Sequence, residues 1–154
     1  MTSELQAALK KRRPNEFLDA LRACFPYAQP SDFPHLSADG KLVVCCNCFA
    51  YEMFSGGYSL ALTNLHDWAD EIVKSLRTIK ASPYAETFAK VVRKAKSEGL
   101  AFTHETDWCA FSTRHGDFAK ETTRDYWGAV DVVARCLRDY ISKHASTFGN
   151  DDAA

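Results

Sequence analysis

The chain has 154 residues, of which 46% are hydrophobic and 25% are charged, a balance typical of one folded globular domain. Its 19 basic and 20 acidic side chains give a net charge of −1, which excludes a large field of one sign for capturing nucleic acid or an anionic membrane. The longest apolar run, residues 42–46, is much shorter than the roughly 20 residues of a membrane helix, and no secretion signal is recognisable. We therefore expect a cytoplasmic protein that does not contact membranes.

Helical periodicity dominates the N-terminal part of the chain. Apolar residues at three- and four-residue steps predict two short helices before Pro26, separated at Pro14. The following segment, 26–34, contains three prolines and is typical of an ordered connector. We assign residues 1–37 to an N-terminal helical extension that packs on the main domain.

Three further stripes of apolar residues predict helices in the centre of the chain. The first covers 41–54, the second runs from Leu65 to Ile79, and the third covers 84–95 with Gly99 as a C-cap. Glycine allows a positive φ where two helices pack tightly, so the first helix is expected to break at a glycine pair. The predicted structural turn consists of Ser55, Gly56, Gly57 and Tyr58.

The last third of the chain contains its least regular stretch and its longest predicted helix. Regular periodicity is weakest over 100–118, and a final helix follows over about 120–145. Phe148 is expected to fold back onto the body, while 149–154 form a frayed tail. No convincing strand remains, so the sequence predicts an all-α fold, a single compact multi-helix domain over 38–148 with a long C-terminal helix.

The six cysteines are expected to be free and mostly buried, because they lie in apolar, helix-like surroundings and the chain can form a core without disulfides. The run Cys45-Cys46-Asn47-Cys48 contains a C-x-x-C step. A structural zinc site needs a second pair of ligands at comparable spacing, and this pair is missing from the sequence. We predict no metal and no other cofactor.

Histidines beside carboxylates are the only candidates for catalytic groups. His66-Asp67 and His104-Glu105 resemble a general base with an orienting carboxylate, but adjacent residues on a helix point in different directions. The sequence has no nucleophile elbow, phosphate-binding loop or dinucleotide glycine motif. We predict a protein that is not an enzyme. The alternative is a small hydrolase using His66, His104 or His115 with nearby carboxylates.

A group of acidic residues around one tryptophan is the best candidate for a binding surface. Trp68 lies at the rim of its helix's apolar stripe, where a part-exposed aromatic side chain can anchor a partner. The alternative is ordinary charge at helix N-termini, where the helix dipole favours anions. The candidate partner-binding residues are Asp67, Trp68, Asp70, Glu71, Asp117, Glu121 and Asp125.

Three phrases of the sequence resemble the bacterial DNA-mimic-protein family. Residues 54–58 (Phe-Ser-Gly-Gly-Tyr) are similar to the family's Asn-Gly-Gly-Phe-like break after a helix. Residues 76–81 (Leu-Arg-Thr-Ile-Lys-Ala) are similar to its Leu-x-x-Ile-Gly-Ala phrase at a matching distance. The closing Tyr-Ile-x-x-His-x-x-x-Phe pattern is matched by Tyr140, Ile141, His144 and Phe148.

The resemblance covers about residues 38–148, with two departures from the family pattern. Ser55 replaces the usual Asn and Lys80 replaces the usual Gly, which alters the break signature without touching the fold. The resemblance implies an all-helical binding module and, from the family's namesake, a dimer that sequesters a DNA-binding protein.

The charge of the chain limits how it could mimic DNA. Duplex DNA carries about one charge per 1.7 Å of helix axis, whereas this chain has a net charge of −1, so only a local acidic face could imitate it. We therefore predict a regulator or inhibitor that sequesters a partner protein, basic or DNA-binding, through a helical face. We expect no direct contact with nucleic acid, and a homodimer is one assembly that the resemblance implies. An immunity-type inhibitor of a toxin or nuclease is the alternative in the same class.

Overall fold

The structure is a computed structural model, and it describes residues 1–25, 33, 35–99, 105–116 and 126–148. These residues contain helices and no strand, which confirms the predicted all-α fold class. No helix among them is long and apolar enough to cross a membrane. In chain order the elements are α1 (Ser3–Leu9), α2 (Pro14–Cys24), α3 (Ala38–Leu65), the 3-10 helix η2 (His66–Trp68), α4 (Ala69–Thr78), α5 (Ser82–Ser97), α6 (Glu105–Arg114) and α8 (Tyr126–Lys143).

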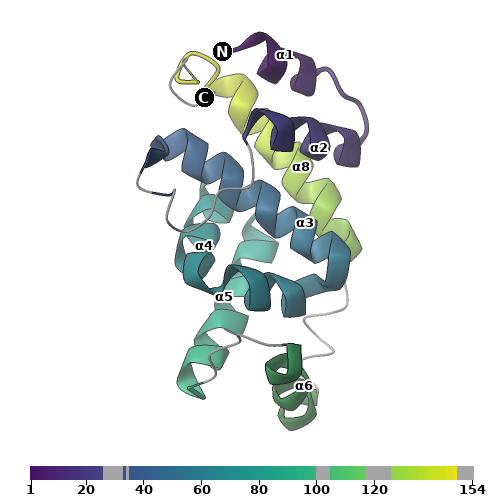
Figure 1. The fold of residues 1–154 in the computed structure, drawn as a ribbon, viewed down its shortest axis with the longest axis vertical. Coiled ribbons are helices and arrows are strands. Elements are labelled where there is room, and N and C mark those ends of the chain that lie inside the picture. The colour runs from purple at the N-terminus through teal and green to yellow at the C-terminus, as the bar shows by residue number, and fades with distance from the viewer. Residues whose placement is uncertain (26–32, 34, 100–104, 117–125, 149–154) are drawn as a thin grey trace.

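Helix α3 is the centre of the fold. It begins at a Ser37 cap, whose hydroxyl oxygen accepts a hydrogen bond of 3.0 Å from the Gly40 backbone N–H. Figure 1 shows α3 crossing the middle of the molecule, with α2 and α8 above it and α4 and α5 below. Its fully buried side chains include Phe49 and Met53, so α3 supplies the apolar surface on which the other helices pack.

The predicted turn at residues 55–58 is a kink inside α3. Gly57 has φ 68° and ψ −155°, a combination that is essentially restricted to glycine. Helical geometry resumes after the kink and continues to Leu65. Gly56 and Gly57 both leave helical φ and ψ, so the kink separates two helical segments directly after the predicted helix over 41–54, and the first segment begins at Ala38 and not at residue 41.

Helix α4 ends in a Schellman motif that uses a lysine where glycine is usual. The Ala81 N–H donates to the Leu76 carbonyl at 2.8 Å, and the Lys80 N–H donates to the Arg77 carbonyl at 3.0 Å. Lys80 has φ 66°, the left-handed conformation that glycine adopts at lowest cost. At the predicted C-cap of α5, Gly99 also has a left-handed φ of 65°, and its N–H donates to the Lys96 carbonyl at 3.2 Å.

The C-terminal third differs from the expectation in one element. Residues 105–114 form α6 inside the stretch predicted to be the least regular. Its one fully buried side chain among those described is Phe111, which packs toward α3, so the apolar repeat is too sparse to reveal a helix. The predicted start of the last helix and the predicted tail lie outside the described residues, which resume with α8 at Tyr126.

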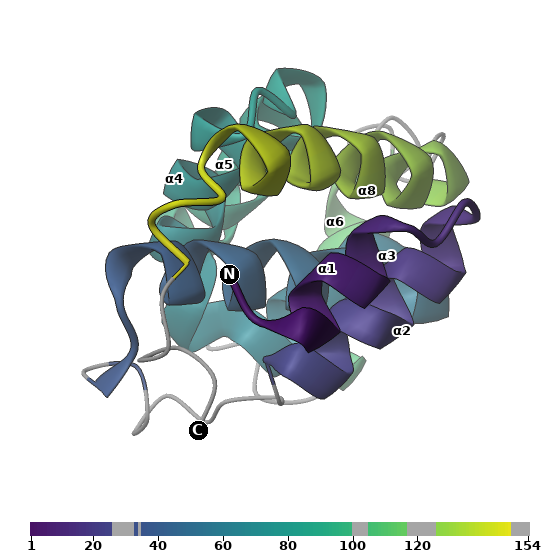
Figure 2. The same ribbon diagram turned by 90° about the horizontal axis from the view of Figure 1, so that it is seen from above.

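The two ends of the described chain close over the same side of α3. Figure 2 shows α1 and α2 side by side in one layer with α3, and α8 crossing over them. Arg138 of α8 lies over the Phe17 ring, 4.5 Å from its centroid, and donates a hydrogen bond of 2.8 Å to the Lys11 carbonyl. Phe148 is buried as predicted, and its ring centroid lies 6.3 Å from that of Phe25.

Candidate functional site

The predicted binding surface lies at η2 and the start of α4, but its tryptophan is part of the core. Trp68 is 5% exposed and its ring centroid lies 4.6 Å from that of Phe33. The expectation of a part-exposed anchor is wrong for Trp68. It assumed a continuous α-helix from Leu65, whereas the tighter 3-10 turn of η2 rotates Trp68 toward the interior.

The acidic side chains of this surface stand beside basic ones. The Lys96 ammonium nitrogen on α5 lies 2.8 Å from a carboxylate oxygen of Asp70, and Lys74 lies 3.6 Å from Glu71. All four side chains are at least half exposed, so the surface has mixed charge and does not form an acidic face. The other predicted acidic residues, Asp117, Glu121 and Asp125, lie outside the described residues.

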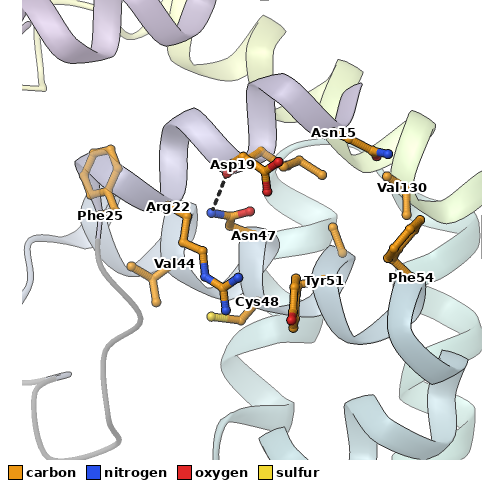
Figure 3. Close-up of a pocket in the computed structure, with 12 residues that line it drawn as sticks. Asn15, Asp19, Arg22, Phe25, Val44, Asn47, Cys48, Tyr51, Phe54 and Val130 are labelled. Atoms are coloured by element: carbon orange, nitrogen blue, oxygen red, sulfur yellow. Dashed lines mark hydrogen bonds between the residues drawn. The ribbon is translucent and has the colours of Figure 1, made fainter. Parts of the chain in front are cut away.

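A second surface is formed by a groove between α2 and the N-terminal part of α3. Its volume is about 290 Å³, close to the lower end of ligand-binding pockets. Figure 3 shows Tyr51 and Phe54 on the α3 side of this groove. They are 43% and 44% exposed, although large apolar side chains are usually buried. The apolar lining consists of Leu18, Phe25, Val44, Cys48, Ala50 and Val130.

Polar groups from both helices reach into the groove. Asn47 is 8% exposed, and its amide nitrogen donates a hydrogen bond of 3.3 Å to the Leu18 carbonyl across the two helices. The Arg22 guanidinium carbon lies 4.2 Å from the Tyr51 ring centroid, a cation–π contact that holds this ring at the groove. Asp19, which is exposed, supplies a carboxylate at the α2 side.

A buried carboxylic acid supports α3 next to the groove. Glu52 accepts a hydrogen bond of 2.9 Å from the Asn64 amide nitrogen, which links the two parts of α3 across its kink. Burial raises the pKa of Glu52, because the low-dielectric surroundings disfavour its charged form, although Asn64 and Arg22 oppose this effect. The polar contacts of Glu52 therefore serve the fold of α3.

Sequence reasoning missed the groove, although a signal for it exists. The apolar stripe of residues 41–54 continues through Phe49, Ala50 and Met53, and Tyr51 and Phe54 lie off that stripe. Two aromatic residues three positions apart and outside the core face point to a binding surface.

The histidines pair with carboxylates at separate places. His66 Nε2 lies 3.4 Å from Asp67, where both side chains are exposed, and His115 Nε2 lies against a carboxylate oxygen of Glu98. His104 lies outside the described residues. In the described part of the chain, no three His, Cys, Asp or Glu side chains form a group that could hold a metal ion.

The contact of His115 with Glu98 belongs to a cluster that attaches α6 to the end of α5. Glu98 also contacts Lys94 at 3.2 Å and Arg114 at 3.0 Å. Burial raises the pKa of Glu98, but hydrogen bonds from Lys94 and His115 outweigh it, so the pKa is lowered. The cluster therefore stabilises the position of α6 while Glu98 is ionised.

All six cysteines are free thiols, as predicted. Three of them, Cys45, Cys46 and Cys48, are buried on α3, whereas Cys109 is exposed. Burial raises the pKa of the Cys45 and Cys48 thiols to about 12, because the thiolate is poorly solvated there. The C-x-x-C step therefore consists of protonated packing residues.

Comparison with known proteins assigns the chain to a family. The family model described as DMP19-like protein, the DNA mimic protein 19-like group, matches residues 34–144. The chain belongs to the DMP19-like protein family. This confirms the resemblance to the DNA-mimic family predicted from the sequence. No curated protein and no solved structure matches the chain.

The phrases that carry the DMP19-like resemblance hold the fold together. The Tyr140 hydroxyl donates a hydrogen bond of 2.7 Å to Asp39 at the start of α3, and its ring stacks on His144 at 4.3 Å. Thr147 donates a further hydrogen bond to the second Asp39 oxygen at 2.5 Å. Burial and the Asp39 carboxylate raise the pKa of Tyr140 to about 12, so this contact persists at neutral pH.

Proposed function

We propose that this DMP19-like chain is a non-catalytic binding module that sequesters a partner protein. The family match over residues 34–144 carries the proposal, because members of this family resemble a DNA mimic, a class that acts by occupying another protein. The regulatory or inhibitory effect follows from that occupation. A basic or DNA-binding protein is the class of partner that the family implies.

We propose the α2–α3 groove as the main contact and the α4 surface as a minor one. Tyr51 and Phe54 offer exposed aromatic area, and aromatic side chains are enriched among the residues that dominate binding energies. At the α4 surface the Asp70 carboxylate forms an ion pair with Lys96, so its attraction for a basic partner is weaker. Apolar contact at the groove therefore supplies most of the affinity.

The test is capture of proteins from the source cell's lysate by the tagged full chain at low and at high salt, read by mass spectrometry. We expect one enriched protein, which duplex DNA displaces if the partner's DNA-binding surface is covered. Two matched double variants locate the contact: Tyr51→Ala with Phe54→Ala, and Asp70→Asn with Glu71→Gln. The proposal predicts that only the aromatic variant loses the partner. If no protein is enriched even at low salt, the binding function itself is wrong.

A further inference from the structure

The groove is lined by a hydrogen-bond acceptor that no described residue uses. Asn47 donates through its amide nitrogen to the Leu18 carbonyl, and no described residue donates to its side-chain oxygen. Although the residue is only 8% exposed, its oxygen is not one of the fully buried side-chain atoms without a partner, so it can be reached from the groove. A ligand that supplies a donor here exchanges a contact of this oxygen with water for a hydrogen bond inside the groove, which gives a modest net gain on binding.

The orientation of this amide is fixed by its partner. If the amide were rotated by half a turn, its oxygen would face the Leu18 carbonyl oxygen, and two acceptors repel each other. The nitrogen must therefore face Leu18. Figure 3 shows the amide oxygen on the opposite side, turned along the groove toward the part enclosed by Asp19, Tyr51 and Phe54.

The rest of the groove defines the remainder of the ligand. The apolar part of the groove lining includes Val44, Val130 and the aromatic ring of Phe25, and the polar part includes Asn15, Asp19 and Arg22. A volume of about 290 Å³ fits one large side chain and is too small for most cofactors. An aromatic ring with one polar edge satisfies both features, since buried Tyr and Trp need a hydrogen-bond partner for their O–H or N–H group.

We propose that the α2–α3 groove receives a tryptophan or tyrosine side chain of the partner protein, whose N–H or O–H group donates to Asn47. The proposal rests on the binding function proposed above and names the chemistry of its contact. Tyr51 and Phe54, nearly half exposed, form a wide apolar rim that the surface around the inserted side chain covers.

Asp19 adds a charge requirement to the same contact. Its exposed carboxylate lies at the groove, and no basic group among the described residues forms an ion pair with it. A Lys or Arg next to the inserted aromatic residue complements this charge. The partner segment is therefore a basic residue adjacent to a tryptophan or tyrosine.

The test uses small blocked probes and the full chain, so it does not depend on isolating the partner. Nitrogen–proton NMR spectra are recorded during titration with N-acetyltryptophanamide, N-acetyltyrosinamide and N-acetylphenylalaninamide. We expect the donor-bearing probes to shift amide signals of α2 and α3 and to bind about two- to tenfold more tightly than the phenylalanine probe. A tryptophan probe methylated on the indole nitrogen has lost its donor and should bind as weakly as the phenylalanine probe. Its isomer methylated on a ring carbon keeps the donor and serves as the size control.

Blocked Lys-Trp and Glu-Trp dipeptides test the charge requirement. We expect Lys-Trp to bind about two- to fivefold more tightly than Glu-Trp, a difference that Asp19→Lys removes or reverses. Glu16→Lys is the matched control, since Glu16 is exposed on the same helix and does not line the groove. Tyr51→Ala, a change at an exposed side chain, should weaken every tryptophan probe at least about fivefold.

Three results would overturn the proposal. Equal affinity for the probes with and without a donor would show that the Asn47 oxygen does not accept a hydrogen bond from the ligand. Signal shifts confined to α4 and α5 would place the contact on the other surface. Free indole binding as tightly as Lys-Trp would identify a small-molecule pocket. Each result leaves lysate capture unaffected, so failure of the groove proposal is distinguishable from failure of the binding function.

Discussion

The α2–α3 groove and the surface at η2 and α4 both border α3, and their polar groups are partnered in opposite ways. At the η2–α4 surface the Asp70 carboxylate finds an ammonium group on the neighbouring helix, and the tryptophan is packed inside. At the groove, aromatic rings are exposed and the Asn47 oxygen has no described donor. The comparison shows that the charges of one surface are partnered within the chain, whereas the apolar surface has an acceptor that no described residue uses, which is why we propose the groove as the contact surface.

The largest expected effect is the loss of stability when a core tryptophan is truncated, compared with truncation of an exposed aromatic residue. Trp68→Ala should lower the free energy of unfolding by about 3–5 kcal/mol, because it empties a buried site against Phe33. Phe54→Ala, the control at the groove, should cost about 1 kcal/mol or less. Denaturant unfolding of both variants measures the difference. Equal costs would mean that the two surfaces are not built differently.

The second prediction concerns the kink of α3, which follows directly after the groove residues Tyr51 and Phe54. Gly57→Ala should destabilise the protein by about 1–3 kcal/mol, since the φ and ψ of Gly57 strain any residue with a Cβ atom. Gly116→Ala is a control, because a Cβ there meets no atom within 4 Å and its backbone is not in the left-handed region. Thermal unfolding compares the two. A neutral Gly57→Ala would show that the kink is not held by glycine.

The third prediction is a stabilising change at the end of α4. Lys80→Gly should raise the free energy of unfolding by about 0.5–1 kcal/mol, because relief of left-handed strain exceeds the added flexibility of the unfolded chain. The reverse experiment, Gly99→Ala, places a Cβ in open space at nearly the same φ and should cost about 1 kcal/mol. Chemical denaturation of both variants measures whether each change raises or lowers the free energy of unfolding. Destabilisation by Lys80→Gly would mean that its side chain makes a contact worth more than the strain.

The smallest effect is expected for the ion pair that neutralises the predicted acidic face. In a double-mutant cycle of Asp70→Asn and Lys96→Met, the coupling should be below about 0.5 kcal/mol, since these side chains are 80% and 61% exposed. The coupling should fall further at high salt. A coupling above about 1 kcal/mol would show that the η2–α4 surface is held rigidly by its charges.

Periodicity predicted the fold class and the buried faces of most helices, because burial of one face is what the spacing of apolar residues records. It did not predict the rotation of Trp68, since three residues of 3-10 helix change the direction of a side chain without changing the apolar pattern. The pattern also could not predict the ion pair between Asp70 and Lys96, because the two residues are 26 positions apart in the sequence and are brought close only by the packing of α5 on α4.

The groove was the least predictable feature, since it exists only when two helices are assembled. The sequence around Asn47 is a run of cysteines and gives no sign of a polar contact. The hydrogen bond of Asn47 depends on the Leu18 carbonyl, which belongs to another helix. Tyr51 and Phe54 were visible as residues off the apolar stripe, but the cavity beside them is a property of the pair α2 and α3.

The family match begins at residue 34, whereas the α2 side of the groove, with Asn15, Asp19 and Arg22, precedes it. The groove that we propose as the contact surface therefore has one wall on α3 inside the matched range and one wall on α2 outside it. A match over residues 34–144 does not by itself include the α2 wall. Comparing the groove between two members of the family therefore requires comparison of the segment before residue 34 as well.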